Sequence, residues 1–138
     1  MSIVQTQTTS FKKELYQAVH NLSSDTIKIA LYTGNANLNA ATTVYTTSNE
    51  VSATGYTAGG NTLTGVAISS SDYTAYVNWA NTSWTSALTA RCALIYNVTQ
   101  GNKSIAVIDF GADKTSTTTF TITMPSNTST TALIRSSN

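Results

Sequence analysis

The chain has 138 residues, the usual size of one domain and enough to enclose a core without disulfides or metals. Charged residues make up only 9% of it, against roughly 25% in an average soluble domain. Apolar residues at 41%, with Ser and Thr at roughly a third, favour a folded, strand-rich protein over a disordered one. The net charge of +1 comes from scattered basic residues, which excludes a nucleic-acid groove built on clustered phosphate contacts.

The first ten residues are mostly polar and contain one apolar pair, Ile3-Val4. We therefore predict an N-terminal arm over 1–10, followed by a single domain over 11–138. The N-terminus lacks the apolar core of a signal peptide, and no stretch approaches membrane-spanning length. Neither a secretory signal nor a membrane partner is expected.

Apolar residues recur at helical spacing between Phe11 and Leu22, with Ser10 available as the N-cap. This is the only helix that the sequence predicts. His20 falls near its C-terminal end, where the helix dipole favours a surface imidazole. We expect His20 on the surface rather than in a catalytic role.

Strands dominate the rest of the chain. Residues 26–33 alternate, with Ile27, Ile29 and Leu31 on one face, and predict a strand. Further short strands, separated by turn residues, are predicted at 62–68, 73–79, 82–85, 90–97, 104–110, 117–124 and 131–135. About eight strands predict a mainly β fold: a jelly-roll-like β-sandwich of two four-stranded sheets with one short N-terminal α-helix. A seven-stranded immunoglobulin-like sandwich is the alternative, although the chain lacks its paired cysteines.

Two patterns place faces within this β fold. Phe120, Ile122 and Met124 alternate with threonines, which predicts an apolar inner face and a hydroxyl outer face. Residues 91–96 and 105–110 are apolar on both faces and are predicted as central strands. Between the first strand and the later ones lies a long, glycine-containing excursion over 34–60, of the kind that usually carries function.

Residues able to perform chemistry are few: one His, one Cys and six carboxylates. A Ser-His-Asp set could be drawn from His20 with Asp25 or Asp72, but no nucleophile-elbow sequence is present. Cys92 lies in an apolar run and is expected as a buried, unreactive thiol. One His and one Cys cannot fill a zinc site. We expect no enzyme, no cofactor and no metal.

The one candidate binding constellation is aromatic: Tyr73, Tyr76, Trp79 and Trp84 lie within a dozen positions. Sugars and protein partners both exploit such clusters. However, Tyr76 has the opposite strand parity to Tyr73 and Trp79. Packing of both tryptophans at the ends of the core is favoured over recognition.

Several runs resemble those of known proteins: Leu31-Tyr-Thr33, the segment 42–60, Ala93 to Asn97, and Ala106 to Gly111. They resemble a family of small structural proteins of tailed bacteriophages. The resemblance covers Phe11 to Arg135 and is most specific over residues 49–60. It implies a virion protein made in the bacterial host cytoplasm, namely a capsid decoration (cement) protein with a jelly-roll-like sandwich. It carries over no catalytic residues.

On this interpretation the partners are the major capsid protein, bound at the outer surface of its shell, and further copies of the chain in a dimer or trimer. Near-zero net charge agrees with self-association because it gives little self-repulsion. The alternative is a tail or fibre-tip component that recognises host surface glycan. The residues expected to contact partners are Ile3, Val4, Asn49, Glu50, Val51, Tyr56, Tyr73, Trp79 and Trp84.

Overall fold

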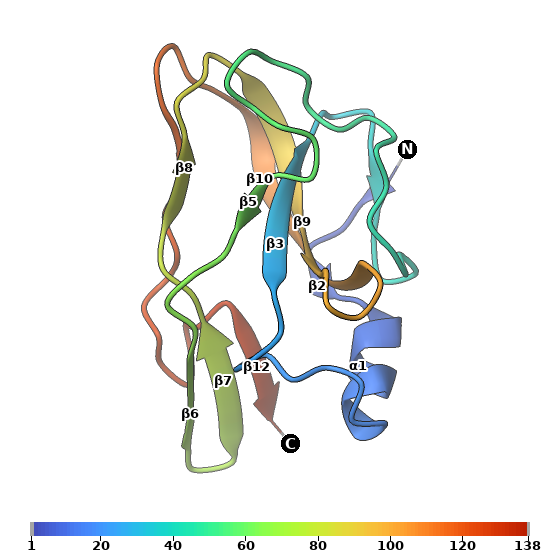
Figure 1. Ribbon diagram of the computed structural model, residues 1–138. Helices are drawn as coiled ribbons and strands as arrows, with labels where there is room; N and C mark the ends of the chain where they lie inside the picture. Colours follow the sequence, from blue (N-terminus) through green and yellow to red (C-terminus); the bar gives the residue numbers. More distant parts are fainter. Residues whose placement is uncertain (1, 138) are drawn as a thin grey trace.

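A computed structural model describes residues 2–137, and it is mainly β with one short helix (Figure 1). Its largest sheet is antiparallel throughout, with the strand order β2-β10-β9-β3-β5. These strands are β2 (Thr6–Gln7), β10 (Lys103–Thr115), β9 (Thr89–Asn97), β3 (Ile27–Tyr32) and β5 (Asn61–Thr62). The strands predicted at 26–33, 90–97 and 104–110 are confirmed as β3, β9 and β10.

Three smaller sheets complete the fold. One has the order β12-β7-β6, and another pairs β11 with β8, both antiparallel; the third pairs β1 with β4 in parallel. Their strands are β12 (Ile134–Ser137), β7 (Thr74–Asn78), β6 (Ala67–Ser71), β11 (Phe120–Ile122), β8 (Thr82–Trp84), β1 (Ser2–Ile3) and β4 (Asn37–Leu38). Within residues 2–137 the sheets therefore hold five, three, two and two strands, rather than the four and four that a regular jelly roll would give.

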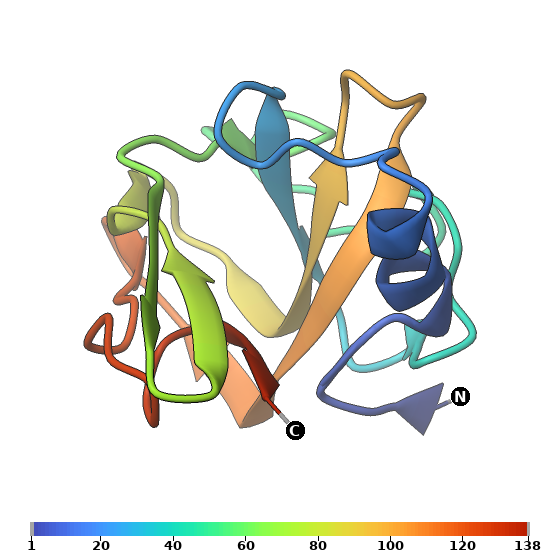
Figure 2. The same cartoon turned by 90° about the horizontal axis from the view of Figure 1, so that it is seen from below.

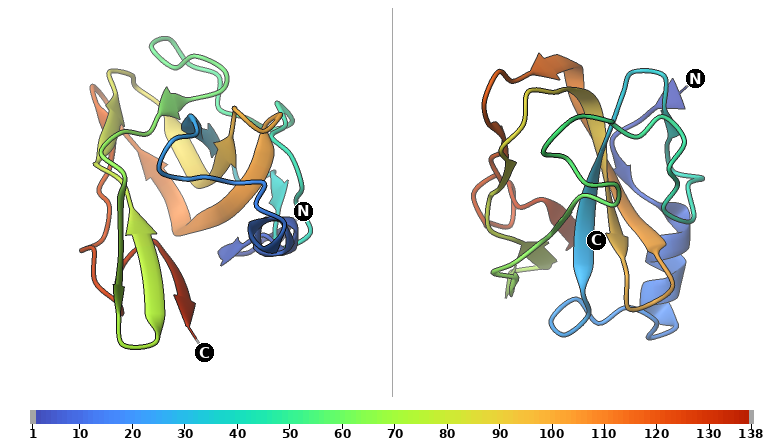
Figure 3. Two further views of the ribbon diagram at one scale, coloured as in Figure 1. Left: turned by 60° about the horizontal axis from the view of Figure 1, so that its bottom comes forward. Right: turned by 45° about the horizontal axis from the view of Figure 1, so that its top comes forward.

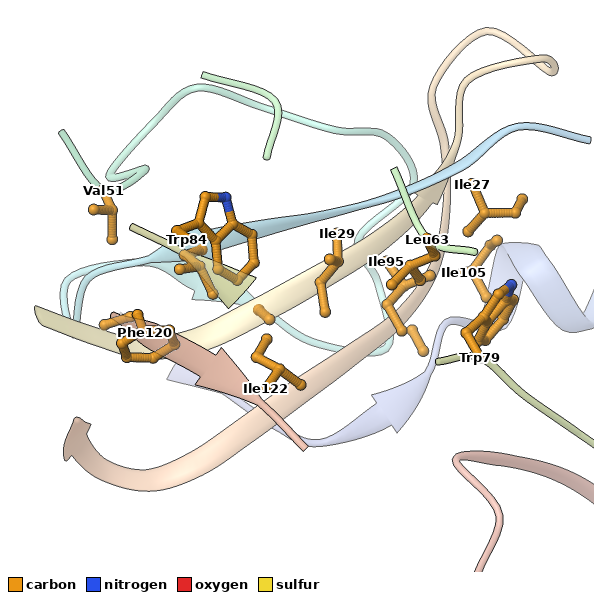
Figure 4. Packing of buried hydrophobic residues seen from close by; sticks show 14 of the residues in the cluster. Ile27, Ile29, Val51, Leu63, Trp79, Trp84, Ile95, Ile105, Phe120 and Ile122 are labelled. Carbon is orange, nitrogen blue, oxygen red and sulfur yellow. The ribbon is translucent and has the colours of Figure 1, made fainter. Parts of the chain in front are cut away.

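Alternation along β3 divides the interior into two cores. Ile27, Ile29 and Leu31 enter a large cluster between the five-stranded sheet and the elements opposite it, where Figure 4 shows Trp84, Phe120 and Ile122 facing Ile29 and Ile95. Ala30 and Tyr32 enter a second cluster on the other face, which includes Ala36 and Leu38 from the segment after β3. This explains why β9 and β10 are apolar on both faces: the chain's own segments cover each side.

Helix α1 (Thr9–Tyr16) is shorter than predicted at its C-terminal end and begins earlier. Its N-cap is Thr8 and not Ser10, because Thr8 Oγ1 accepts a hydrogen bond from Phe11 N at 3.3 Å. Ala18 adopts a left-handed φ of +59°, which ends the helical path after Gln17 and turns the chain back toward the sheet.

The segment expected as an arm is part of two sheets in residues 2–10. Ser2 and Ile3 pair with Asn37 and Leu38 in β1–β4, and β2 pairs with β10. The helix then begins at Thr9, so the expected boundary between residues 10 and 11 falls inside α1.

Candidate interaction surfaces

Glu50 organises the long excursion through three hydrogen bonds. Its Oε1 accepts from Tyr45 Oη at 2.6 Å, and its Oε2 accepts from Tyr56 Oη at 2.6 Å and from Gly59 N at 2.7 Å. Tyr56 Oη in turn accepts from Leu31 N at 2.9 Å, which ties the network to β3. Hydrogen bonds to a carboxylate are among the stronger kinds. The loop is therefore fixed to the sheet although it has almost no regular structure.

A second set of contacts closes the loop on β9. Tyr96 Oη donates to Gly59 O at 2.6 Å, and the Tyr45 and Tyr96 rings stack with centroids 4.6 Å apart. Burial, with the Glu50 charge nearby, raises the pKa of Tyr96 to about 12, so the phenol stays a neutral donor. Gly60 has a φ of +79°, and a Cβ there would lie 1.8 Å from Ile29 O. Glycine is required at this position by both the backbone angle and the close approach.

Of the four loop residues predicted to contact partners, the structure leaves only Asn49 exposed. Val51 and Tyr56 are 6% and 8% exposed and belong to the large core, and Glu50 is engaged by its tyrosines. In the structure these three side chains contact other parts of the chain, and their contact with a partner stays a prediction. Their internal partners, such as Leu31 and Tyr45, are set by tertiary pairing that the local sequence does not reveal.

Both tryptophans are core residues, each 4% exposed. The Trp84 ring lies 5.8 Å from that of Tyr56 and 6.2 Å from that of Phe120. Tyr73 is 83% exposed at the tip of the β6–β7 hairpin, so it alone of the three partner-contact aromatics predicted at 73–84 is accessible. The favoured interpretation, core packing, is confirmed. A glycan site built on Trp79 and Trp84 is not available on the surface.

His20 is buried, at 8% exposure, so its predicted surface position was wrong. Its Nε2 lies 2.9 Å from Glu14 Oε1, and its Nδ1 lies 2.9 Å from Nδ2 of Asn97 at the end of β9. Asn97 Nδ2 also donates to Asp25 Oδ2 at 2.8 Å, which fixes the amide orientation. His20 Nδ1 is therefore the acceptor. The proton of the ring is on Nε2, which donates a hydrogen bond to Glu14 Oε1.

This cluster is a structural tie and not a relay to a nucleophile. Burial raises the pKa of Asp25, but hydrogen bonds from Asn97, the Asn21 N–H and Gln100 outweigh it, so the pKa lies below its ordinary value. In residues 2–137 neither ring nitrogen of His20 has a hydroxyl partner. Asp72, the other carboxylate considered, is exposed at the tip of the β6–β7 hairpin and makes no hydrogen bond to His20.

The two apolar residues near the N-terminus have different environments. Ile3 is partly buried against the second core cluster. Val4 is 49% exposed while its N–H donates to Leu38 O at 3.0 Å. Val4 and Asn49 thus remain accessible, whereas Ile3 serves the fold.

Two surface cavities are mainly apolar in their lining. One, of about 540 Å³, lies beside β11 and includes Phe110, Ile122 and Met124. The other, of about 420 Å³, lies between α1 and the β12-β7-β6 sheet and includes Leu15 and Ile68. No cluster of titratable side chains accompanies either cavity; the only such groups in the linings are Lys114 in the first and His20 and Tyr76 in the second.

Charge is unevenly distributed over the molecule. We call β6, β7, β8 and β11, with the segments that connect them (residues 63–88 and 116–133), the neutral layer. Of the chain's seven basic and six acidic side chains it carries one, Asp72. Figure 2 shows the layer on the side of the molecule away from α1.

Exposed hydroxyl groups are frequent in this layer. Thr119, Thr121 and Thr123 are exposed while Phe120 and Ile122 are buried, which confirms the predicted alternation. The exposed hydroxyl residues of the layer also include Thr64, Ser69, Ser70, Ser71, Ser83, Thr85, Thr117, Thr118, Ser126, Thr128, Thr130 and Thr131. Sequence composition indicated the scarcity of charge, but only the fold gathers the uncharged segments on one side.

Comparison with protein-family models, with curated proteins and with solved structures finds no match to this chain. In residues 2–137 no helix is long and apolar enough to cross a bilayer. The same residues contain no group of three or more His, Cys, Asp and Glu side chains placed to hold a metal ion. Cys92 is fully buried, and burial raises the pKa of its thiol to about 12.

Proposed function

We propose that this chain is a bacteriophage virion structural protein: a capsid decoration (cement) protein that binds the outer surface of the major capsid shell and stabilises it. The observation that carries the proposal is the neutral layer with its single charged residue, Asp72. The cores of protein interfaces are depleted in charge. A hydroxyl surface is wetted by water yet costs far less to desolvate than a charged one.

Rigidity supports the same proposal. Association is weakened when loops must be ordered on binding, and a preformed surface avoids that cost. In this chain the longest irregular segment is already fixed by the Glu50 hydrogen bonds. A domain of this kind can bridge shell subunits through many small contacts without rearranging.

The identity of the partner rests on the resemblance of residues 42–60, and of the runs at 93–97 and 106–111, to structural proteins of tailed phages. A position on the virion surface and a non-enzymatic role belong to the proposal for the same reason. So does a jelly-roll-like sandwich, in which β8, β11 and the β12-β7-β6 sheet form the layer facing the five-stranded sheet.

Binding to purified shells of the encoding phage tests the proposal, with two matched variants. Thr121→Glu places a charge on the neutral layer, and Thr43→Glu places the same charge on an exposed threonine outside it; neither side chain makes a hydrogen bond in residues 2–137. We expect wild type and Thr43→Glu to co-sediment with expanded but not immature shells. Thr121→Glu should bind at least tenfold more weakly, about 1.4 kcal/mol or more.

The proposal fails if wild type does not bind expanded shells. The role of the neutral layer fails if the two variants bind equally. Removing residues 1–10 would be a less specific test, because it also removes the β2–β10 pairing and the Thr8 N-cap. Point substitutions on the surface therefore give the cleaner result.

A further inference from the structure

Strand β6 is an edge strand without the usual protection. All five of its residues are exposed, and its sequence, Ala67-Ile-Ser-Ser-Ser71, has no charge and no proline. Its pairing with β7 is regular from Ala67↔Asn78 to Ser71↔Thr74, with no bulge. Figure 3 shows the β6–β7 hairpin extending away from the body of the molecule. Natural proteins usually protect such edges with charges, proline, bulges or covering segments.

The other sheet edges in residues 2–137 are shorter or protected. Strands β2 and β5 have two residues each, and Asn61 Nδ2 in β5 is bonded to Ser83 O at 2.8 Å. Strand β12 has four residues, carries the charge of Arg135, and has Gln7 Nε2 donating to Arg135 O at 2.8 Å. Strand β6 is therefore the longest edge strand without a charge in the part of the chain that the structure describes.

Hairpin geometry determines which backbone groups of β6 are free. The turn has two residues, so Ser71 and Thr74 form a hydrogen-bonded pair, and such pairs alternate along an antiparallel ladder. Ser69 and Ala67 then also bond to β7, while Ile68 and Ser70 direct their N–H and C=O groups outward. In the described residues these outward groups have no hydrogen-bond partner, and the one hydrogen bond to β6 from outside its sheet is a long one at the end of the strand, from Asn127 Nδ2 to Ala67 O at 3.5 Å.

The inner face of this sheet ends on an exposed apolar side chain. Ile134, Val77 and Ile68 lie directly across from one another on β12, β7 and β6. Their exposed fractions are 5%, 6% and 55%, so the stripe is buried at two strands and open at the third. A strand added beside β6 would place a side chain against Ile68 and complete the stripe.

A second copy of β6 meets these requirements. Two β6 strands paired antiparallel about a twofold axis offer each other the same outward groups, since such an interface is self-complementary. With the axis at Ile68, the stripe runs without interruption through both molecules. The two Asp72 residues would lie eight residues apart, about 27 Å, beyond the ~8 Å screening length at physiological salt. The net charge of +1 adds little repulsion.

We propose that β6 is a self-association edge, at which two copies of the chain pair antiparallel across Ile68 to form a continuous six-stranded sheet. One five-residue edge is smaller than a standard interface of about 1,200–2,000 Å². The dimer is therefore weak in dilute solution and forms at high local concentration, as on a surface that holds many copies. The pairing itself needs no capsid, so it stands or falls separately from the proposed function.

Sedimentation over about 0.01–1 mM protein tests the edge. Ser70→Pro removes an N–H that points away from β7, so the hydrogen bonds between β6 and β7 are kept. Ile68→Lys places a charge in the stripe, and Thr121→Lys places it elsewhere on the neutral layer as a control. We expect wild type and Thr121→Lys to associate, and both β6 variants to associate at least tenfold more weakly with unchanged circular dichroism. A monomeric wild type at 1 mM, or a Ser70→Pro variant that associates like wild type, overturns the proposal.

Single cysteines at Ile68, Ser69 and Ser70 test the register by oxidation to a covalent dimer. The buried Cys92 can stay in place. Ser137→Cys, at the exposed end of β12, gives the yield of random collision. We expect the yield to be highest for Ile68→Cys and to fall at Ser69→Cys and Ser70→Cys. A maximum at Ser70, or yields no higher than that of Ser137→Cys, overturns the pairing across Ile68.

Discussion

The loop at 45–60 and the β6–β7 hairpin reverse the usual relation between regularity and burial. The loop has almost no regular structure, yet Glu50 and its tyrosines fix it to β3 and β9. The hairpin has ideal pairing, yet every residue of β6 is exposed. The loop is held in place by hydrogen bonds between buried polar groups. The hairpin is available for binding because the outer edge of β6 has backbone groups without hydrogen-bond partners.

The largest effect is expected for Gly60→Ala. Its Cβ would overlap Ile29 O, and alanine is strained at a φ of +79°. We expect a loss of at least about 4 kcal/mol in the free energy of unfolding, or no folded protein. Gly111→Ala is the matched control, because its φ is +82° but no atom lies within 4 Å of the added Cβ. It should cost about 1 kcal/mol in urea denaturation. Equal losses would show that the close approach is unimportant.

Glu50→Ala should have the next largest effect. The change leaves two tyrosine hydroxyls and the Gly59 N–H without their acceptor. Each unsatisfied buried group costs about 1–3 kcal/mol. Water that enters the space left by the side chain can bond to some of the three groups, so we expect a total loss of about 3 kcal/mol in the free energy of unfolding. Ser52→Ala, two residues later, is the control: Ser52 is exposed and is not among the residues with a positive φ, so the change should alter stability by less than about 0.5 kcal/mol. Faster hydrogen exchange at Gly59 and Val51 in Glu50→Ala alone would confirm that the loop has been released.

Truncation along the apolar stripe compares burial within one sheet. Ile134→Ala should cost about 2–4 kcal/mol, because Ile134 is 5% exposed in the large core. Ile68→Ala, at 55% exposure, should cost less than about 1 kcal/mol in dilute protein. Denaturation midpoints measured at micromolar concentration distinguish them. Similar losses would mean that Ile68 is buried in solution.

The smallest expected effect is a pH dependence at Asp25. Its pKa in the folded state is below the ordinary value of 3.8, because hydrogen bonds to the carboxylate outweigh burial. Ionised Asp25 therefore adds stability above about pH 4, and this contribution is lost as the pH falls through the folded-state pKa. The stability difference between wild type and Asp25→Asn should shrink between about pH 6 and pH 3. A constant difference across that range contradicts the assignment.

Local periodicity was sufficient for part of the fold. The alternation in β3, the two-faced apolar runs of β9 and β10, and the threonine face of β11 all follow from a period of two within one strand. The burial of Cys92 follows from its apolar run in the same way. These predictions needed no information about distant segments.

Tertiary pairing decided the rest. Helix α1 stops at Tyr16 because Ala18 turns the chain so that His20 can meet Asn97, a contact between residues 77 positions apart. Strand β10 continues past residue 110 because a register shift near Gly111, whose N–H donates to Asp109 Oδ1, absorbs the irregularity. No local pattern marks either event.

The candidate site shows the same limit. Glu50, Val51 and Tyr56 were predicted to contact partners, and in the structure the contacts that they make are internal. The exposed edge at β6 was missed, since five small residues give no signal until the fold leaves them unpaired. The usable cue was the low charge, whose position on the surface only the fold reveals.

Hydroxyl-radical footprinting of the protein on expanded capsid shells tests the central claim most directly. Tyr73 and Tyr16 are 83% and 94% exposed, and they lie in the neutral layer and in α1 respectively. Both should react fully in the free monomer. We expect bound protein to lose reactivity at Tyr73 and at Met124 while Tyr16 stays reactive. Protection of Tyr16 with Tyr73 and Met124 unchanged, or no change at any of the three, would contradict attachment through the neutral layer.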